Sequence, residues 1–150
     1  MAEKAQYVTL GVNGEIFAAP VDKVQEILEM RPVARLPQAP PNLLGMTDVR
    51  GLGIPVLDLR LTLGLPEADD TENTRIVVLN VGGPGATTTL GLRTDRVFEV
   101  TVLDSETLDA PPSVSGNWRG HSVAGIGRRN GSFVTVLDLD RLLGGMAAAA

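Results

Sequence analysis

The chain repeats itself, and the order of the repeated motifs limits the folds open to it. The string Val-Leu-Asp-Leu at residues 56–59 recurs at residues 136–139, and a glycine follows each copy a few residues later. Upstream, residues 22–27 match residues 95–100. The alternative is that short apolar strings recur by chance, but two matches in the same order favour a duplicated unit. We therefore expect two related halves, at about residues 7–65 and 75–144.

Turn and cap signals divide each half into short strands. Asn13-Gly14 and Asn130-Gly131 separate apolar runs, and Asn-Gly is a strong hairpin signal because both positions favour positive φ. Asp58 and Asp138 each precede a short apolar segment that ends at glycine, which predicts capped helical turns. The expected strands are residues 7–12, 15–19, 46–50, 54–57, 76–81, 87–92, 123–126 and 133–137.

The segments between these strands differ in character. Residues 21–28 follow Pro20 with apolar residues at helical spacing, which predicts a short helix whose C-terminal half could instead be extended. Residues 31–41 are rich in proline and are expected to be extended and irregular. Residues 66–74 are acidic and polar, which is typical of a linker, and residues 103–116 form a long polar loop.

Composition favours an all-β fold. Hydrophobic residues make up 43% of the chain but aromatic residues only 3%, so the core consists mainly of Val, Leu and Ile, which suit a pleated surface. Short antiparallel strands remove their edges by closing into small barrels. Two units of ~70 residues would be marginal alone, so we expect them to share a buried interface.

Several classes of function are disfavoured. The absence of cysteine excludes a disulfide scaffold and a thiolate metal site. A net charge of −5 without a basic run argues against nucleic acid as a partner. No apolar stretch approaches the ~20 residues of a membrane span, so direct membrane insertion is not expected. Residues 1–6, which lack a signal-like segment, and 145–150 are expected to be flexible tails.

Catalytic and ligand-binding alternatives were weighed on individual residues. Asp58 and Asp138 occupy equivalent repeat positions, which raises a hydrolase with an aspartic dyad, but capping explains both more simply. His121 is the only histidine, and Ser122 beside it lacks a partner pattern for nucleophilic catalysis. Trp118 is interpreted as an anchor for its loop, and the glycine-rich residues 82–85 as a turn. A barrel that binds a small ligand stays open as an alternative.

With these motifs in order, the sequence resembles the CheW family of chemotaxis coupling proteins over roughly residues 7–143. The specific part is residues 45–63, which contain Gly-Met-Thr-Asp-Val-Arg-Gly and Ile-Pro-Val-Leu-Asp-Leu-Arg. Further matches are residues 24–27, 40–41, 76–81, 94–97, 125–127 and 136–143.

The resemblance implies a fold and a set of partners. It implies one CheW-like domain over residues 7–144, built from two intertwined five-stranded SH3-like β-barrels around a third apolar core, with strands that can be exchanged between the halves. It implies a cytoplasmic adaptor at receptor arrays, with no enzymatic activity and no cofactor. The implied partners are the cytoplasmic tip of chemoreceptors and the regulatory domain of the histidine kinase CheA. Family members can form rings with the kinase domain, and the sequence leaves that open here.

The resemblance also assigns two sets of contact residues. The receptor-binding set, in the groove between the barrels, is Val21, Val24, Glu26, Ile27, Arg50 and Val97. The kinase-binding set, around the proline-rich segment, is Val33, Leu36, Leu43, Leu44 and Gly45. For the apolar members the alternative is plain core, and for Glu26 and Arg50 it is an ordinary structural salt bridge.

A few positions depart from the family pattern. Thr87, Thr88, Thr89 and Arg93 replace residues that are commonly aliphatic, and Asp48 stands where Asn is common. These departures leave open which kinase and receptors the chain serves. A paralogue in a non-flagellar chemosensory pathway is therefore the main alternative function.

Overall fold

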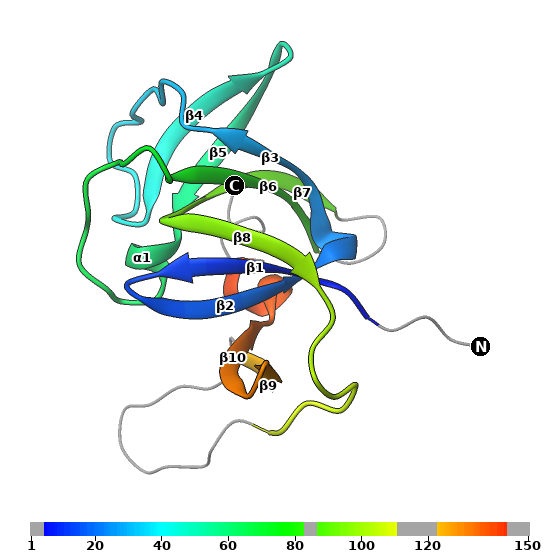
Figure 1. The fold of residues 1–150 in the computed structure, drawn as a ribbon. Coiled ribbons are helices and arrows are strands. Elements are labelled where there is room, and N and C mark those ends of the chain that lie inside the picture. Colours follow the sequence, from blue (N-terminus) through cyan, green and yellow to red (C-terminus); the bar gives the residue numbers. More distant parts are fainter. Residues whose placement is uncertain (1–4, 83–86, 111–122, 144–150) are drawn as a thin grey trace.

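The computed structural model describes residues 5–82, 87–110 and 123–143, and these residues form two five-stranded sheets (Figure 1). The first sheet has the order β8-β1-β2-β10-β9 and the second the order β3-β6-β7-β5-β4. The strands of the first are β1 (Tyr7–Val12), β2 (Glu15–Pro20), β8 (Arg96–Thr101), β9 (Val123–Arg129) and β10 (Ser132–Leu137). Those of the second are β3 (Val24–Glu29), β4 (Leu43–Val49), β5 (Leu52–Asp58), β6 (Arg75–Val81) and β7 (Thr88–Thr94). The all-β prediction with two five-stranded units is confirmed.

The two sheets do not follow the two halves of the sequence. The N-terminal hairpin β1–β2 pairs with β8 and β10 from the second half, and β6–β7 pair with β3 and β5 from the first. Both sheets nevertheless have the same plan. Each contains one parallel pair, β2–β10 in the first sheet and β5–β7 in the second, and the other strand pairs are antiparallel. The repeat in the sequence therefore corresponds to two similar sheets, and each sheet contains a hairpin from the other half of the chain.

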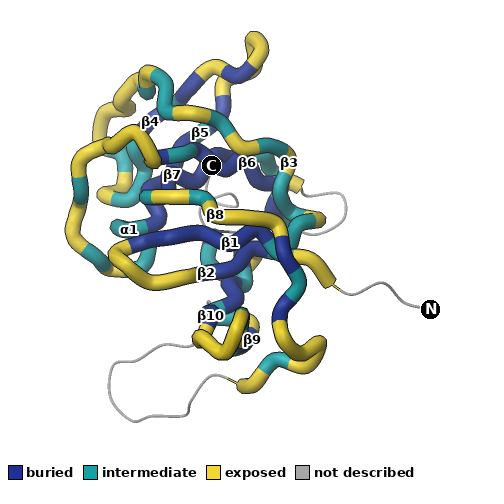
Figure 2. Tube along the Cα trace, in the orientation of Figure 1, coloured by how far each residue is buried: buried dark blue, intermediate teal, exposed yellow. Residues whose placement is uncertain are grey.

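A core between the sheets joins them. The main apolar cluster takes Leu10 and Phe17 from the first sheet and Leu79 and Leu92 from the second, and all four are buried. Figure 2 shows the buried residues concentrated along β1 and β6. Smaller clusters lie within each sheet, around Val136 in the first and Val78 and its neighbours in the second. This arrangement confirms that neither unit buries its aliphatic side chains alone.

The full helix predicted at residues 21–28 is wrong, but the alternative of an extended C-terminal half is confirmed. Residues Val21–Lys23 form one short 3-10 turn, and residues 24–29 continue as the edge strand β3. Its burial alternates along the strand, and a bulge between Val24 and Glu26 shifts its register against β6. The helical spacing misled because the apolar residues do not follow this alternation, since Ile27 is exposed and Glu26 is half-buried.

The predicted turns and caps are confirmed where the structure describes them. Asn13-Gly14 and Asn130-Gly131 have the positive φ angles expected of tight hairpins. The Asp58 carboxylate accepts a hydrogen bond from the backbone N–H of Arg60 at the start of helix α1 (Leu59–Thr62), and Gly64 follows with φ of 81°. The Asp138 carboxylate accepts one from the N–H of Arg141, in the helical residues 139–143.

Each sheet is extended by a segment that returns to its edge strand. Ala34 pairs with Met46 of β4, and Asp109 pairs with Ile126 of β9. Glycines permit both approaches: a Cβ on Gly45 would lie 2.0 Å from the Ala34 carbonyl oxygen, and one on Gly125 would lie 2.7 Å from the Leu108 side chain.

Candidate protein-binding surface

An ion pair on the outside of the second sheet combines two residues that the sequence had singled out. Glu26 lies on the edge strand β3, and Arg50 lies in the turn between β4 and β5. The Arg50 Nη1 donates to Glu26 Oε1 at 2.9 Å, and Nη2 donates to Oε2. This is a two-point fork between a planar guanidinium and a carboxylate, which fixes both side chains in orientation.

The Glu26–Arg50 pair is exposed and keeps its charge. The hydrogen bond from Arg50 lowers the pKa of Glu26, so its carboxylate stays ionised at neutral pH. The Arg50 side chain remains 68% exposed although both ends of its fork are occupied. An exposed pair of this kind contributes little to folding, so stability alone gives no strong reason for its two-point geometry.

The backbone conformation at Arg50 is also unfavourable for an arginine. Arg50 has φ of 53°, a left-handed conformation that suits Asn better than a long side chain. The equivalent turn of the first sheet has Asn130 at this position, with φ of 52°. The second sheet therefore accepts a small backbone penalty in order to present a guanidinium at this turn.

The other residues predicted to bind a receptor divide into two groups. Val21, Val24 and Val97 are half-buried and pack against the main core cluster, so they lie at its rim. Ile27 is 40% exposed on β3 and does not belong to that cluster. The structure thus brings the three valines to one core and places Ile27 on the same strand as Glu26. Their receptor contacts stay a prediction.

The residues predicted to bind a kinase have different surroundings. Leu36 is 41% exposed, whereas Leu43 packs against the main core cluster. Val33 and Leu44 line a groove beside the proline-rich segment. Gly45 is buried with φ of 147° against the Ala34 carbonyl, so it has a structural role in the closing bridge. Leu36, Val33 and Leu44 are the members of this set that a partner can reach.

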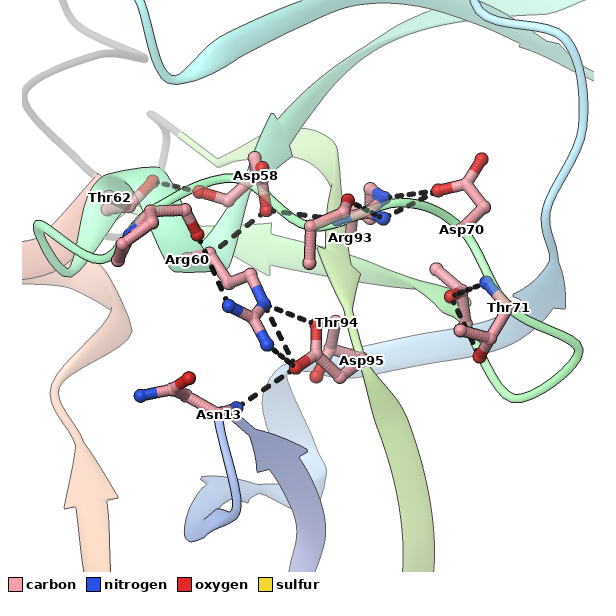
Figure 3. A network of polar contacts seen from close by, with 12 residues as sticks. Asn13, Asp58, Arg60, Thr62, Asp70, Thr71, Arg93, Thr94 and Asp95 are labelled. Carbon is pink, nitrogen blue, oxygen red and sulfur yellow. Dashed lines mark hydrogen bonds and ion pairs between the residues drawn. The ribbon is translucent and has the colours of Figure 1, made fainter.

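Sequence reasoning did not identify a buried arginine at the bottom of that groove. The Arg93 side chain, on β7, is only 5% exposed and lies between Asp58 and Asp70 (Figure 3). Its Nη1 is 3.4 Å from Asp58 Oδ1, and its Nε donates to Asp70 Oδ1 at 2.7 Å. Burial is the main cause that raises the pKa of Asp58, and Arg93 works against that rise. The available signal was an arginine inside an apolar strand pattern.

A second network, also in Figure 3, ties the two sheets together. Arg60 of α1 donates from Nε and Nη2 to the Asp95 carboxylate, at 2.7 Å for the shortest contact. Asp95 also accepts from the backbone N–H of Asn13 at 2.9 Å. Burial would raise the pKa of Asp95, but these hydrogen bonds and the Arg60 charge lower it overall. The network links the β1–β2 turn to the helix that follows β5.

The catalytic alternatives receive no geometric support from the part of the chain that is described. Asp58 is paired with Arg93, whereas Asp138 lies 3.7 Å from Arg141, so each carboxylate has a separate structural partner. Within residues 5–82, 87–110 and 123–143, His, Asp and Glu side chains form no group of three or more that could hold a metal ion. No helix in those same ranges is long and apolar enough to cross a bilayer.

Several predictions lie wholly or partly outside the described residues. They concern the flexible tails at residues 1–6 and 145–150, the end of the loop at residues 103–116, His121 and Ser122, the Trp118 anchor, most of the glycine-rich turn at residues 82–85, and Gly144.

Comparison with known proteins agrees with this architecture. A family model described as the CheW-like domain matches residues 6–146. The chain is 30% identical over 133 residues to the chemotaxis protein CheW of Bacillus subtilis, across 88% of this chain and 82% of that protein. It is 30% identical over 133 residues to protein FrzA of Myxococcus xanthus, across 85% and 78% of the two chains.

Structural comparison extends the likeness to the fold. The crystal structure of the scaffolding protein TtCheW from Thermoanaerobacter tengcongensis matches with a TM-score of 0.83 and 23% identity, over 94% of this chain and 93% of that one. The paired sheets, the exchanged hairpin and the family match over nearly the whole length lead to one conclusion: this chain belongs to the CheW-like family.

Proposed function

We propose that the protein is a non-catalytic adaptor that couples chemoreceptors to the histidine kinase CheA in chemotaxis signalling. The observation that carries the proposal is the family match over residues 6–146, together with the exposed Glu26–Arg50 fork on the second sheet. Relatives across this family carry the name chemotaxis protein CheW, and the solved structure is described as a scaffolding protein. An adaptor needs surfaces that discriminate between states of its partners, and it needs no cofactor.

The proposed receptor contact is the rim formed by Val21, Val24 and Val97, with Ile27 beside it. A receptor helix laid along this rim would bury half-exposed aliphatic side chains, which is a common mode of helix recognition. The proposed kinase contact uses Leu36 and the groove residues Val33 and Leu44. Residues 7–144 would act as one domain in the cytoplasm, at the receptor array.

The test is co-purification with a receptor cytoplasmic fragment and a CheA regulatory domain. Arg50→Glu replaces the guanidinium by a carboxylate that repels Glu26, so we expect it to lose at least one partner. The matched control is Arg129→Glu, which makes the same charge change on the first sheet, where Arg129 Nε lies 3.4 Å from Glu99. Circular dichroism must show that both variants are folded. Normal binding of both partners by Arg50→Glu would count against the assignment of this surface.

A second candidate is the same adaptor function in a pathway that does not control flagella. The observation that favours it is the likeness to FrzA, at the same identity as to the CheW of Bacillus subtilis. Exchange experiments would separate the two: the chain should restore chemotactic swimming to a strain that lacks CheW if it serves the flagellar pathway, and fail if it serves another.

A further inference from the structure

A groove of about 730 Å³ lies between the segment that follows β3 and the linker that follows α1. Its two walls carry opposite charges. Arg31 and Arg35 lie on the side of the proline-rich segment, and Glu67, Asp69 and Asp70 lie on the side of the linker. The buried guanidinium of Arg93 also lines the groove and lies between Asp58 and Asp70 in Figure 3. The groove is therefore a polar site, and the carboxylates of the linker already lie opposite its arginines.

The guanidinium of Arg93 has two faces with different partners. On the inner side, Nη1 faces Asp58, whose side chain is 3% exposed and is held at the end of β5. On the linker side, Nε and Nη2 both lie within 2.7 Å of Asp70 Oδ1, and Nη2 also donates to the Ala68 carbonyl at 2.9 Å. The edge formed by Nε and Nη2 is the part of a guanidinium that binds carboxylates best. Asp70 occupies that edge.

Asp70 is a replaceable partner, whereas Asp58 is not. The Asp70 side chain is 54% exposed, and it belongs to a run of residues without helix or strand. Glu67 and Asp69 beside it are also exposed. Exchange of Asp70 for another carboxylate keeps the buried guanidinium paired, and it releases an irregular segment that loses freedom when it is held. Another carboxylate could take its place at small net cost.

The charge of the groove depends on whether the linker occupies it. With the linker in place, its three carboxylates and Asp58 face three arginines among the described lining residues. Without the linker, Asp58 is the one acidic residue left in the lining beside the three arginines, with Glu26 near Arg31 and Asp95 near Arg93 outside the groove. The chain as a whole carries a net charge of −5, so this would be a local basic site on an acidic protein.

We propose that this groove binds an acidic segment of a partner protein, and that linker residues 67–70 occupy it as an internal competitor. The partner's carboxylate replaces Asp70 on the Nε and Nη2 edge of Arg93, and Arg31 and Arg35 attract the neighbouring carboxylates. Val33 and Leu44 offer an apolar contact in the same groove. This site is separate from the Glu26–Arg50 fork, but it shares Val33 and Leu44 with the proposed kinase contact, so it rests on that part of the proposed function and names an acidic segment as its ligand.

The test uses a fluorescein-labelled hexaglutamate peptide as the acidic probe and fluorescence anisotropy as the measurement. The variant Glu67→Gln/Asp69→Asn/Asp70→Asn removes the competing carboxylates, and we expect it to bind the probe at least about tenfold more tightly than the wild type. The matched control, Glu15→Gln/Glu29→Gln/Glu106→Gln, removes the same charge from exposed positions elsewhere. An equal gain in both variants, or a gain in neither, would overturn the proposal.

A second pair of measurements locates the probe without relying on a change at buried Arg93. In the linker variant, adding Arg31→Gln/Arg35→Gln should remove most of the gained affinity, and both positions belong to the segment outside the two sheets. In NMR spectra of the linker variant, the Arg93 Nε–H signal should shift when hexaglutamate is added and stay unchanged when hexalysine is added. An Arg93 signal that does not respond to hexaglutamate would place the peptide elsewhere and refute the proposed site.

Discussion

Two ion pairs at corresponding ends of the repeat, here called clamps, each join a helical turn to the segment that leads into an edge strand, and their charges run in opposite directions. In one clamp, Arg60 of α1 binds Asp95 just before β8, and Asp95 also accepts from the N–H of Asn13 in the β1–β2 turn. In the other, Asp140 of the second helical segment binds Lys23 just before β3, and it accepts from the N–H of Gly82 after β6. Arg60 and Asp140 occupy equivalent repeat positions, but Lys23 aligns with Arg96 and not with Asp95, so the duplication has kept the place of the ion pair without keeping both of its residues.

The two clamps also differ in strength. Arg60 and Asp95 have side chains that are 14% and 26% exposed, and the guanidinium reaches both carboxylate oxygens. Lys23 and Asp140 are 30% and 44% exposed, and the ammonium is a single point charge at 3.2 Å. A planar fork that is partly shielded from water holds a carboxylate better than an exposed ammonium does. Corresponding places in the two halves therefore hold ion pairs of unequal strength.

The same contrast appears at the capping aspartates. Asp58 is buried with Arg93, whereas Asp138 is 33% exposed and pairs with the exposed Arg141. Continuing the parallel register of β2 and β10 places Pro20 where β7 has Arg93. Only the second sheet thus carries a buried charge, and the following changes test how far the two sheets differ.

The largest effect is expected for Arg93→Met. It leaves the Asp58 carboxylate buried without a cation, so we expect a loss of about 3–5 kcal/mol in the free energy of unfolding. The loss should be smaller at pH 4 than at pH 7, because a raised pKa means that acid protonates Asp58 and removes the buried charge. Urea unfolding at both pH values measures this. Asp138→Asn is the control, expected to cost about 1 kcal/mol or less.

Gly45→Ala should have the next largest effect. A methyl group there would lie against the Ala34 carbonyl and would need a left-handed backbone, so we expect a loss of about 2–3 kcal/mol. Gly125→Ala meets Leu108 Cβ at 2.7 Å and the Asp109 carbonyl at 3.1 Å, which is a less severe overlap and needs no left-handed backbone, so it should cost less. Chemical denaturation of both variants measures the difference. Equal losses would show that the two closing segments are equally rigid.

Asp95→Asn should cost about 1–2 kcal/mol at neutral pH, because it weakens the charged hydrogen bonds from Arg60. The folded pKa of Asp95 is lowered, so its contribution is present above the unfolded value of about 3.9 and is lost as the pH falls through the lower folded value. The stability difference between wild type and variant should therefore shrink in acid. The parallel change, Asp140→Asn, should have a smaller effect; a larger one would reverse the order of the two clamps.

The smallest effect on stability is expected for Arg50→Asn. Asn suits the left-handed turn, as Asn130 does in the first sheet, and this gain offsets the lost ion pair with Glu26. We expect the melting temperature to change by less than about 4 °C while partner binding falls. Calorimetry and co-purification measure the two effects. Unchanged binding would show that the guanidinium has no role in recognition.

Local chemistry explains why much of the fold was predictable. The Asn-Gly hairpins and the Asp58 cap depend on residues a few positions apart, so their signals lie within short windows. The helix predicted at residues 21–28 is limited to one 3-10 turn and its C-terminal half is extended, because β3 forms through pairing with β6, some fifty residues later in the chain. At the candidate site, the Glu26–Arg50 pair came from a family resemblance, whereas its fork geometry came from the fold.

The sequence by itself determined that this chain is a duplicated, strand-rich molecule with defined turns and caps, because those features depend on the conformational preferences of neighbouring residues. The tertiary structure decided that the β1–β2 hairpin pairs with the opposite half and that Arg93 lies buried between Asp58 and Asp70. Strand exchange and charge burial depend on contacts between residues far apart in the chain, and their energies arise only when the sheets pack together.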